Sequence, residues 1–143
     1  MKVGELALVA RCTVETVRYY EREGLLPAPE RTAANYRHYA QAHLDRLRFI
    51  RNCRALDMTH AEIRALLEMI DHPAGDCRAI NELLDQHIEH VEARIGELRQ
   101  LQQQLVTLRQ RCQNERPIDA CGILLGLAAM ETEALPPRPS HLG

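Results

Sequence analysis

The sequence contains very few aromatic residues: one Phe, four Tyr and no Trp, which make up 3% of its 143 residues. A chain with so few large rings is not expected to build a large globular core. Leu, Ala, Glu, Arg and Gln are abundant instead, and these residues favour helices. The composition therefore predicts a mainly α protein in which helices pack on helices.

Long hydrophobic runs are also missing. No apolar segment is long enough to span a bilayer, and Met1 to Glu5 lack the apolar stretch of a signal peptide. We therefore expect a cytoplasmic protein without a membrane partner. In that reducing compartment the five cysteines are expected to be thiols or metal ligands rather than disulfides.

Enzyme signatures are absent as well. The sequence has no nucleophile motif, no phosphate-binding loop and no alternation of strands and helices that would form a catalytic pocket. We therefore do not expect an enzyme.

The charges are unevenly distributed along the chain. The formal net charge is −2, but residues 1–56 carry ten Lys and Arg against six Asp and Glu, whereas residues 57–143 carry eight against fourteen. A basic amino-terminal part joined to an acidic remainder favours a polyanionic partner for the first part. The alternative is an ordinary solvated surface.

Residues 1–75 are predicted to form a winged helix-turn-helix DNA-binding domain. Short helices over 5–10 and 14–23 are separated by a tight turn, which is the arrangement of a helix-turn-helix. Thr13 is a suitable N-cap for the second helix, and Gly24 is suited to end it.

The rest of that domain is expected to be a wing and two further helices. Residues 30–39 predict a small β-wing. A third helix is expected over 42–56. A fourth opens with the capping box Thr59–Glu62 and runs through Leu67.

Residues 76–112 predict a long dimerisation helix. Its early apolar residues recur at steps of four and three, a coiled-coil pattern that shifts by one position between Leu98 and Leu101. One helix cannot bury such a stripe, so an antiparallel second copy of the chain is the expected partner. Packing onto the chain's own amino-terminal domain is the alternative. The apolar positions are Leu84, Ile88, Val91, Ile95, Leu98, Leu101, Leu105 and Leu108.

The carboxyl-terminal part is predicted to be a metal-binding loop and short helix over 113–130, followed by a disordered tail over 131–143. The predicted fold is thus a winged helix-turn-helix domain, a long antiparallel coiled-coil dimerisation helix and a C-terminal metal-binding loop.

Two clusters of Arg and Tyr flank the predicted helix-turn-helix. Arg can bond phosphates or a guanine edge, and Tyr hydroxyls commonly hold phosphates. The alternatives are a solvated helix face for the arginines and a core position for one of the paired tyrosines. The expected DNA contacts are Thr13, Thr16, Arg18, Tyr19, Tyr20, Tyr36, Arg37 and Tyr39.

Three cysteines outside this domain predict a metal site. Cys77 begins the long helix, Cys112 ends it and Cys121 follows in the loop. Cys77 and Cys112 are 35 residues apart, or roughly 50 Å at ~1.5 Å per residue. One chain therefore cannot hold both in one site, whereas an antiparallel pair brings Cys77 of one chain beside Cys112 and Cys121 of the other. The alternative for each thiol is a buried small hydrophobe, which is what we expect of Cys12 and Cys53.

Thiolates are soft ligands that favour thiophilic ions. Three of them suit lead or mercury, and cadmium would recruit a fourth ligand. Structural zinc usually needs four ligands. His72, His87 and His90 are the candidates for the fourth, and each is alternatively a solvent-facing residue.

Several segments of the chain resemble the MerR family of winged-helix transcriptional activators, and the resemblance covers about residues 1–130. The segments are Gly4–Ala7, Glu15–Leu26 and Asn35–Tyr39, while Ile50–Arg54 with Leu56–Met58 resembles the cadmium- and lead-responsive members. The resemblance implies a homodimer on a pseudo-palindromic operator, in a promoter whose spacer is too long for RNA polymerase. It further implies that metal binding makes the protein distort that DNA and so activates heavy-metal resistance genes.

The same resemblance narrows the metal to Cd(II) or Pb(II). Cys77 sits where copper-type members lack cysteine, and Gln113 and Asn114 after Cys112 depart from the zinc-responsive pattern. The four clustered cysteines of the iron–sulfur member are absent. Mercury-responsive members share the three-cysteine spacing, so Hg(II) remains a competitor. Cadmium regulators often carry a His-rich tail, and His141 alone does not support a second metal site.

A different class of function is also compatible with these cysteines. They could hold structural Zn(II) or form a redox switch, with constitutive DNA binding. A metal-dependent change in promoter output separates these possibilities.

Overall fold

The computed structural model describes residues 1–132, and the chain divides into two compact units, one over Met1–Ile80 and one from Asn81 onward. The predicted tail over 131–143 lies outside the described residues from residue 133 on. Within residues 1–132, no helix combines the length and apolar character needed to cross a membrane.

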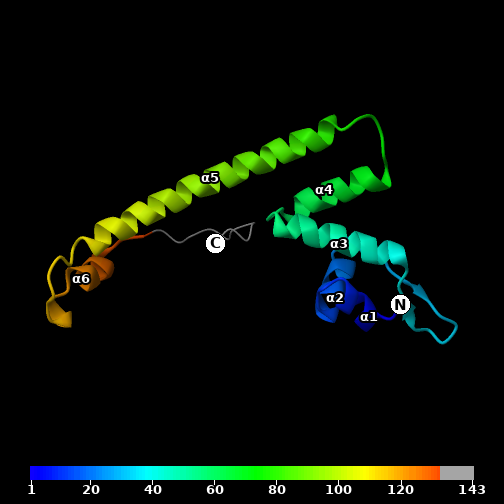
Figure 1. Ribbon diagram of the computed structural model, residues 1–143, viewed down its shortest axis with the longest axis horizontal. Coiled ribbons are helices and arrows are strands. Elements are labelled where there is room, and N and C mark those ends of the chain that lie inside the picture. The colour runs from blue at the N-terminus through cyan, green and yellow to red at the C-terminus, as the bar shows by residue number, and fades with distance from the viewer. Residues whose placement is uncertain (133–143) are drawn as a thin grey trace. The chain divides into compact units, whose positions relative to one another are not determined.

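The first unit begins with two short helices, α1 (Val3–Val9) and α2 (Val14–Arg22), as Figure 1 shows. The predicted cap is present, because Thr13 Oγ1 accepts a hydrogen bond from the Thr16 backbone N–H at 3.1 Å. Beyond α2, Gly24 adopts a φ of 73°, the left-handed conformation in which a helix commonly ends. The helix-turn-helix predicted from the sequence is therefore confirmed.

A two-stranded wing follows, made of β1 (Glu30–Arg31) and β2 (Arg37–His38). The strands are antiparallel, with Glu30 opposite His38 and Arg31 opposite Arg37. Asn35 in the connecting turn has a φ of 65°, a conformation that Asn tolerates better than most residues. The wing expected over 30–39 is thus present.

Two helices complete the first unit, α3 (Gln41–Ala55) and α4 (His60–Asp71). The capping box at the start of α4 is formed as expected, because the Thr59 backbone N–H donates to Glu62 Oε1 at 2.9 Å and the Glu62 N–H to Thr59 Oγ1 at 3.2 Å. The prediction that this helix stops at Leu67 is wrong.

The extra turn of α4 is held by an ion pair with α3. The Arg46 guanidinium on α3 donates to both carboxylate oxygens of Asp71, at 2.7 and 2.9 Å. Arg46 also donates to the Leu25 carbonyl at 2.9 Å, so one side chain joins α4, α3 and the segment after α2. Pro73 follows two residues beyond Asp71 and disfavours further helix.

The core of the first unit lies where α1, α2, the wing and α3 meet. Burying each Leu side chain of this size contributes about 1.5–3 kcal/mol, which favours the packing of these helices on one another. The clustered buried residues are Leu6, Ala7, Ala10, Val17, Leu26, Tyr39, Leu44 and Leu47.

The second unit is built on the long helix α5 (Arg78–Arg109), followed by a short 3-10 turn (Ile118–Ala120) and α6 (Gly122–Ala129). Figure 1 shows α6 folded back beside the C-terminal end of α5. The described chain is mainly helical, with the helix-turn-helix, wing, long helix and C-terminal segment in the predicted order. The fold class predicted from the sequence is therefore confirmed.

Candidate functional site

The exposed face of α2 presents the side chains expected to contact DNA. Arg18 and Arg22 are exposed and lie one turn apart on this helix. At the start of α2, the hydroxyls of Thr13 and Thr16 lie 2.9 Å apart. The helix therefore offers basic and hydroxyl groups suited to phosphate oxygens.

Tyr19 and Tyr20 are half-buried on α2 and form an aromatic group with His60 of α4. The Tyr19 hydroxyl lies 3.3 Å from His60 Nδ1, and the two tyrosine ring centroids are 5.6 Å apart. Tyr20 packs against the core, and burial raises the pKa of its hydroxyl. The alternative of a core position for one of the pair thus describes Tyr20 better than Tyr19.

The wing residues differ strongly in their exposure. Tyr36 is 70% exposed, whereas Tyr39 is 1% exposed. Tyr39 donates its hydroxyl hydrogen bond to Glu21 of α2, and burial followed by this hydrogen bond raises the pKa of Tyr39. A ring enclosed in this way does not face a ligand, so the DNA contact expected of Tyr39 is corrected to a core position.

Arg37 also reaches Glu21, whose Oε2 lies 3.2 Å from Arg37 Nη1. Glu21 therefore joins the side chains of Tyr39 and Arg37 in the wing to α2. The sequence alone did not indicate this role. The available signal in the sequence was an acidic residue that stands between Arg18 and Arg22 along the chain.

Cys12 and Cys53 lie in or beside the core of the first unit. Cys53 is buried, and burial raises the pKa of its thiol. Cys12 is half-buried, and burial raises its pKa against the opposing effect of the nearby Arg51 charge. The packing role predicted for both fits these positions.

Cys112 and Cys121 are brought together at the far end of the second unit. Cys112 lies three residues beyond the end of α5, and Cys121 occupies the N-cap of α6. The pKa of Cys121 is lowered chiefly by the backbone N–H of Leu124, then by that of Ile123 and by a hydrogen bond with the Cys112 thiol. The two sulfur atoms are therefore neighbours, and the N-terminus of α6 favours the thiolate form of Cys121.

Cys77 is exposed and immediately precedes α5. The start of the helix is capped by Asp76, whose Oδ1 accepts from the Arg78 backbone N–H at 3.0 Å. The 32 residues of α5 span about 48 Å at ~1.5 Å per residue. Cys77 thus lies before one end of a long helix, and the Cys112–Cys121 pair lies after the other.

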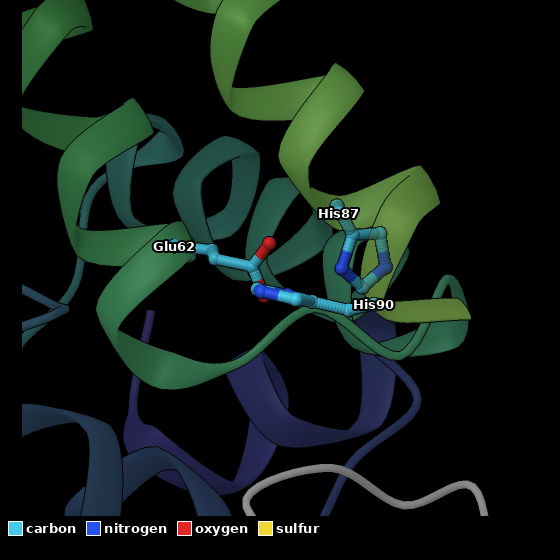
Figure 2. A group of neighbouring side chains, drawn as sticks. All are labelled: Glu62, His87 and His90. Carbon is cyan, nitrogen blue, oxygen red and sulfur yellow. The ribbon is translucent and has the colours of Figure 1, made fainter. Parts of the chain in front are cut away.

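The three histidines considered as a fourth ligand lie away from this thiol pair along the chain. His87 and His90 are one turn apart on α5, with ring centroids 6.5 Å apart, and Figure 2 shows both rings on that helix. His72 is exposed after α4, and its Nε2 lies 3.5 Å from Glu68 Oε1.

The chain matches two descriptions of one family. The family described as MerR HTH family regulatory protein matches residues 1–70, and that described as MerR, DNA binding matches residues 44–108. The chain is 48% identical over 111 residues to the HTH-type transcriptional regulator ZntR homolog of Haemophilus influenzae, which covers 78% of this chain and 82% of that protein.

Two solved structures resemble the chain over most of its length. The lead(II) complex of the regulator PbrR691 from Ralstonia metallidurans CH34 is 50% identical, with a TM-score of 0.80 over 89% of this chain and 98% of that chain. The mercury(II) complex of MerR from Bacillus megaterium MB1 is 32% identical, with a TM-score of 0.71 over 90% and 99%. Because the matched family consists of transcriptional regulators, the expectation that the chain is not an enzyme is confirmed. The chain belongs to the MerR family of DNA-binding helix-turn-helix transcriptional regulators.

Proposed function

We propose that this protein is a heavy-metal-responsive regulator that binds a promoter operator as a homodimer and activates resistance genes when Cd(II) or Pb(II) binds Cys77, Cys112 and Cys121. Activation takes place at RNA polymerase bound to the same promoter. The observation that carries the proposal is the close approach of Gly122 to the Arg111 carbonyl, which brings the segments that carry Cys112 and Cys121 together beyond the end of α5.

The DNA contacts come from α2 and the wing. Arg18 is exposed on α2 and Tyr36 on the wing, where both can reach phosphates. Thr13, Thr16 and Tyr19 contribute hydroxyls from the same helix region. Arg37 combines contact with DNA and support of the wing, because its guanidinium also pairs with Glu21.

A second copy of the chain is the partner of α5. Large apolar side chains are exposed along this helix, and burial of such a stripe is the usual driving force for helix pairing. In antiparallel pairing, Cys77 of one copy meets Cys112 and Cys121 of the other, so each dimer has two equivalent sites. The exposed large apolar side chains of α5 are Ile80, Leu84, Ile88, Ile95, Leu98, Leu101, Leu105 and Val106.

The donor set favours a soft ion. Two adjacent thiols and a third from the partner provide sulfur ligands, which suit Cd(II), Pb(II) and Hg(II) better than hard cations. The likeness to a lead-bound regulator at 50% identity supports Pb(II), and the likeness to a mercury-bound one at 32% keeps Hg(II) as the alternative. Structural Zn(II) would need a fourth ligand.

The test is a promoter–reporter assay with a panel of Cd(II), Pb(II), Hg(II) and Zn(II). We expect Cd(II) or Pb(II) to give the strongest induction, and Cys112→Ser to remove it. Cys53→Ala is the matched control, because this thiol is buried in the first unit and should leave induction intact. Strongest induction by Hg(II) would select the alternative metal, and constant output with every ion would contradict the proposal.

A further inference from the structure

Gly122 lies in close contact with the backbone of Arg111. A Cβ added at Gly122 would stand 2.5 Å from the Arg111 carbonyl oxygen and 3.3 Å from the Arg111 carbonyl carbon. Carbon and oxygen atoms that are not bonded do not approach so closely, so one of the two segments would have to move. Because the obstructing atoms belong to the backbone, no side-chain rotation can relieve the contact.

Gly126 also faces this region, but the atoms nearest to it belong to side chains that can move. A Cβ there would lie 2.8 Å from Arg111 Nη1 and 3.1 Å from Leu108 Cδ1. Both atoms are at the ends of side chains, and the guanidinium can swing away. Gly96 in the middle of α5 has nothing within 4 Å of an added Cβ. The space available for an added Cβ therefore increases from Gly122 through Gly126 to Gly96.

The close contact between Gly122 and the Arg111 backbone lies directly beside the two thiols. Arg111 precedes Cys112, and Gly122 follows Cys121, so the contact closes the loop at the level of the cysteines. The Cys112 thiol donates to the Asn114 carbonyl at 3.5 Å within the same loop, and Cys121 lies at the N-cap of α6, directly before Gly122. A side chain at position 122 would push the two segments apart and move the sulfurs with them.

We propose that Gly122 is a positioning residue of the metal site: the absence of its side chain sets the distance between the Cys112 and Cys121 sulfurs. This inference rests on the proposed function, because it concerns the same thiol pair. Residues that orient metal ligands without touching the ion typically change metal affinity by about 10- to 100-fold.

The test compares Gly122→Ala, Gly126→Ala and Gly96→Ala in the full-length protein. Affinity for Cd(II) or Pb(II) is measured by chelator competition, and the thiolate-to-metal absorption band is recorded for each variant. We expect Gly122→Ala to bind about 10- to 100-fold more weakly with an altered band. Gly126→Ala should change much less, and Gly96→Ala should match the wild type. Affinity of the metal-free protein for operator DNA should stay the same in all three.

Wild-type affinity in Gly122→Ala would overturn the inference and leave the proposed function standing. Failure of the wild-type protein to bind either ion would instead contradict the proposed function itself. If Gly122→Ala does not fold, oxidation of the metal-free wild-type protein by diamide, which takes up the two electrons and two protons released by the thiols, provides the second measurement. The inference requires a Cys112–Cys121 disulfide to form readily, as detected by peptide mass spectrometry, and its absence would overturn the inference.

Discussion

The hydroxyl of Tyr39, at the end of the wing, donates a hydrogen bond to the carboxylate of Glu21 on α2. Tyr39 is also one of the largest fully buried side chains of the first unit. A single residue therefore ties the wing to α2 and fills the core between them. The orientation of the wing relative to α2 depends on this contact.

Replacement of Tyr39 by Phe should destabilise the first unit. The ring remains buried, but the Glu21 carboxylate loses a hydrogen bond, and such bonds to charged groups contribute about 1.5–3 kcal/mol. The free energy of unfolding in urea is the measurement. Tyr36→Phe is the matched control, because Tyr36 is 70% exposed and should unfold like the wild type. Equal stability of both variants would show that the hydrogen bond has no energetic role.

The Arg46–Asp71 pair should make stability depend on pH in the acid range. The hydrogen bond from Arg46 holds the pKa of Asp71 below its ordinary value. A carboxyl whose folded-state pKa is depressed adds stability that is fully present above the unfolded pKa and is lost as pH falls through the folded one. The stability difference between wild type and Asp71→Asn should therefore be present at neutral pH and shrink in acid. Urea unfolding at several pH values measures it.

An Arg46→Gln background provides the control for that titration. Without the guanidinium, Asp71→Asn should no longer change stability in a pH-dependent way. A pH-dependent difference that persists in this background would assign the effect to another group.

Arg18→Ala should weaken operator binding without unfolding the protein. Arg18 is exposed on α2, and each lost phosphate contact reduces the log–log salt dependence of binding by about one unit. Arg37→Ala should also weaken binding, and because Arg37 pairs with Glu21 it should disturb the wing as well. Titrations at several salt concentrations are the measurement, with Arg116→Ala in the second unit as control. An unchanged affinity and slope for Arg18→Ala would remove it from the DNA interface.

Ile95→Asp should separate the proposed dimer. Ile95 is exposed on α5 within the apolar stripe, and a carboxylate there would be placed in an apolar interface without a partner. Sedimentation velocity distinguishes monomer from dimer. Gln100→Asp on the same helix, outside the stripe, should remain dimeric. An intact dimer in Ile95→Asp would mean that α5 does not carry the association.

Mixed dimers test whether each metal site is shared between chains. Homodimers of Cys77→Ser and of Cys112→Ser should both lose full-affinity metal binding. A heterodimer of the two should regain one complete site, with Cys77 from one chain and Cys112 with Cys121 from the other. Metal stoichiometry on differently tagged heterodimers should therefore be about half that of wild type. If no full-affinity site returns in the heterodimer, the cross-subunit arrangement is wrong.

Local features of the first unit could be predicted from the sequence because their causes lie within a few residues. The N-cap at Thr13, the capping box of Thr59 with Glu62, and the left-handed Gly24 each depend on hydrogen bonds or backbone freedom at the position itself. The order of the elements and the spacing of the cysteines could also be predicted, because both follow directly from the positions of residues along the chain.

Contacts between distant segments were decided only by the tertiary structure. Nothing near Tyr39 distinguishes a buried ring from one that faces DNA, because its burial depends on α2 and the core. The last turn of α4 depends on Arg46, 25 residues before Asp71. The closure of the cysteine loop likewise depends on the approach of Gly122 to the Arg111 carbonyl. In each case the stabilising or excluding atom belongs to another element, so no local pattern in the sequence carries the information.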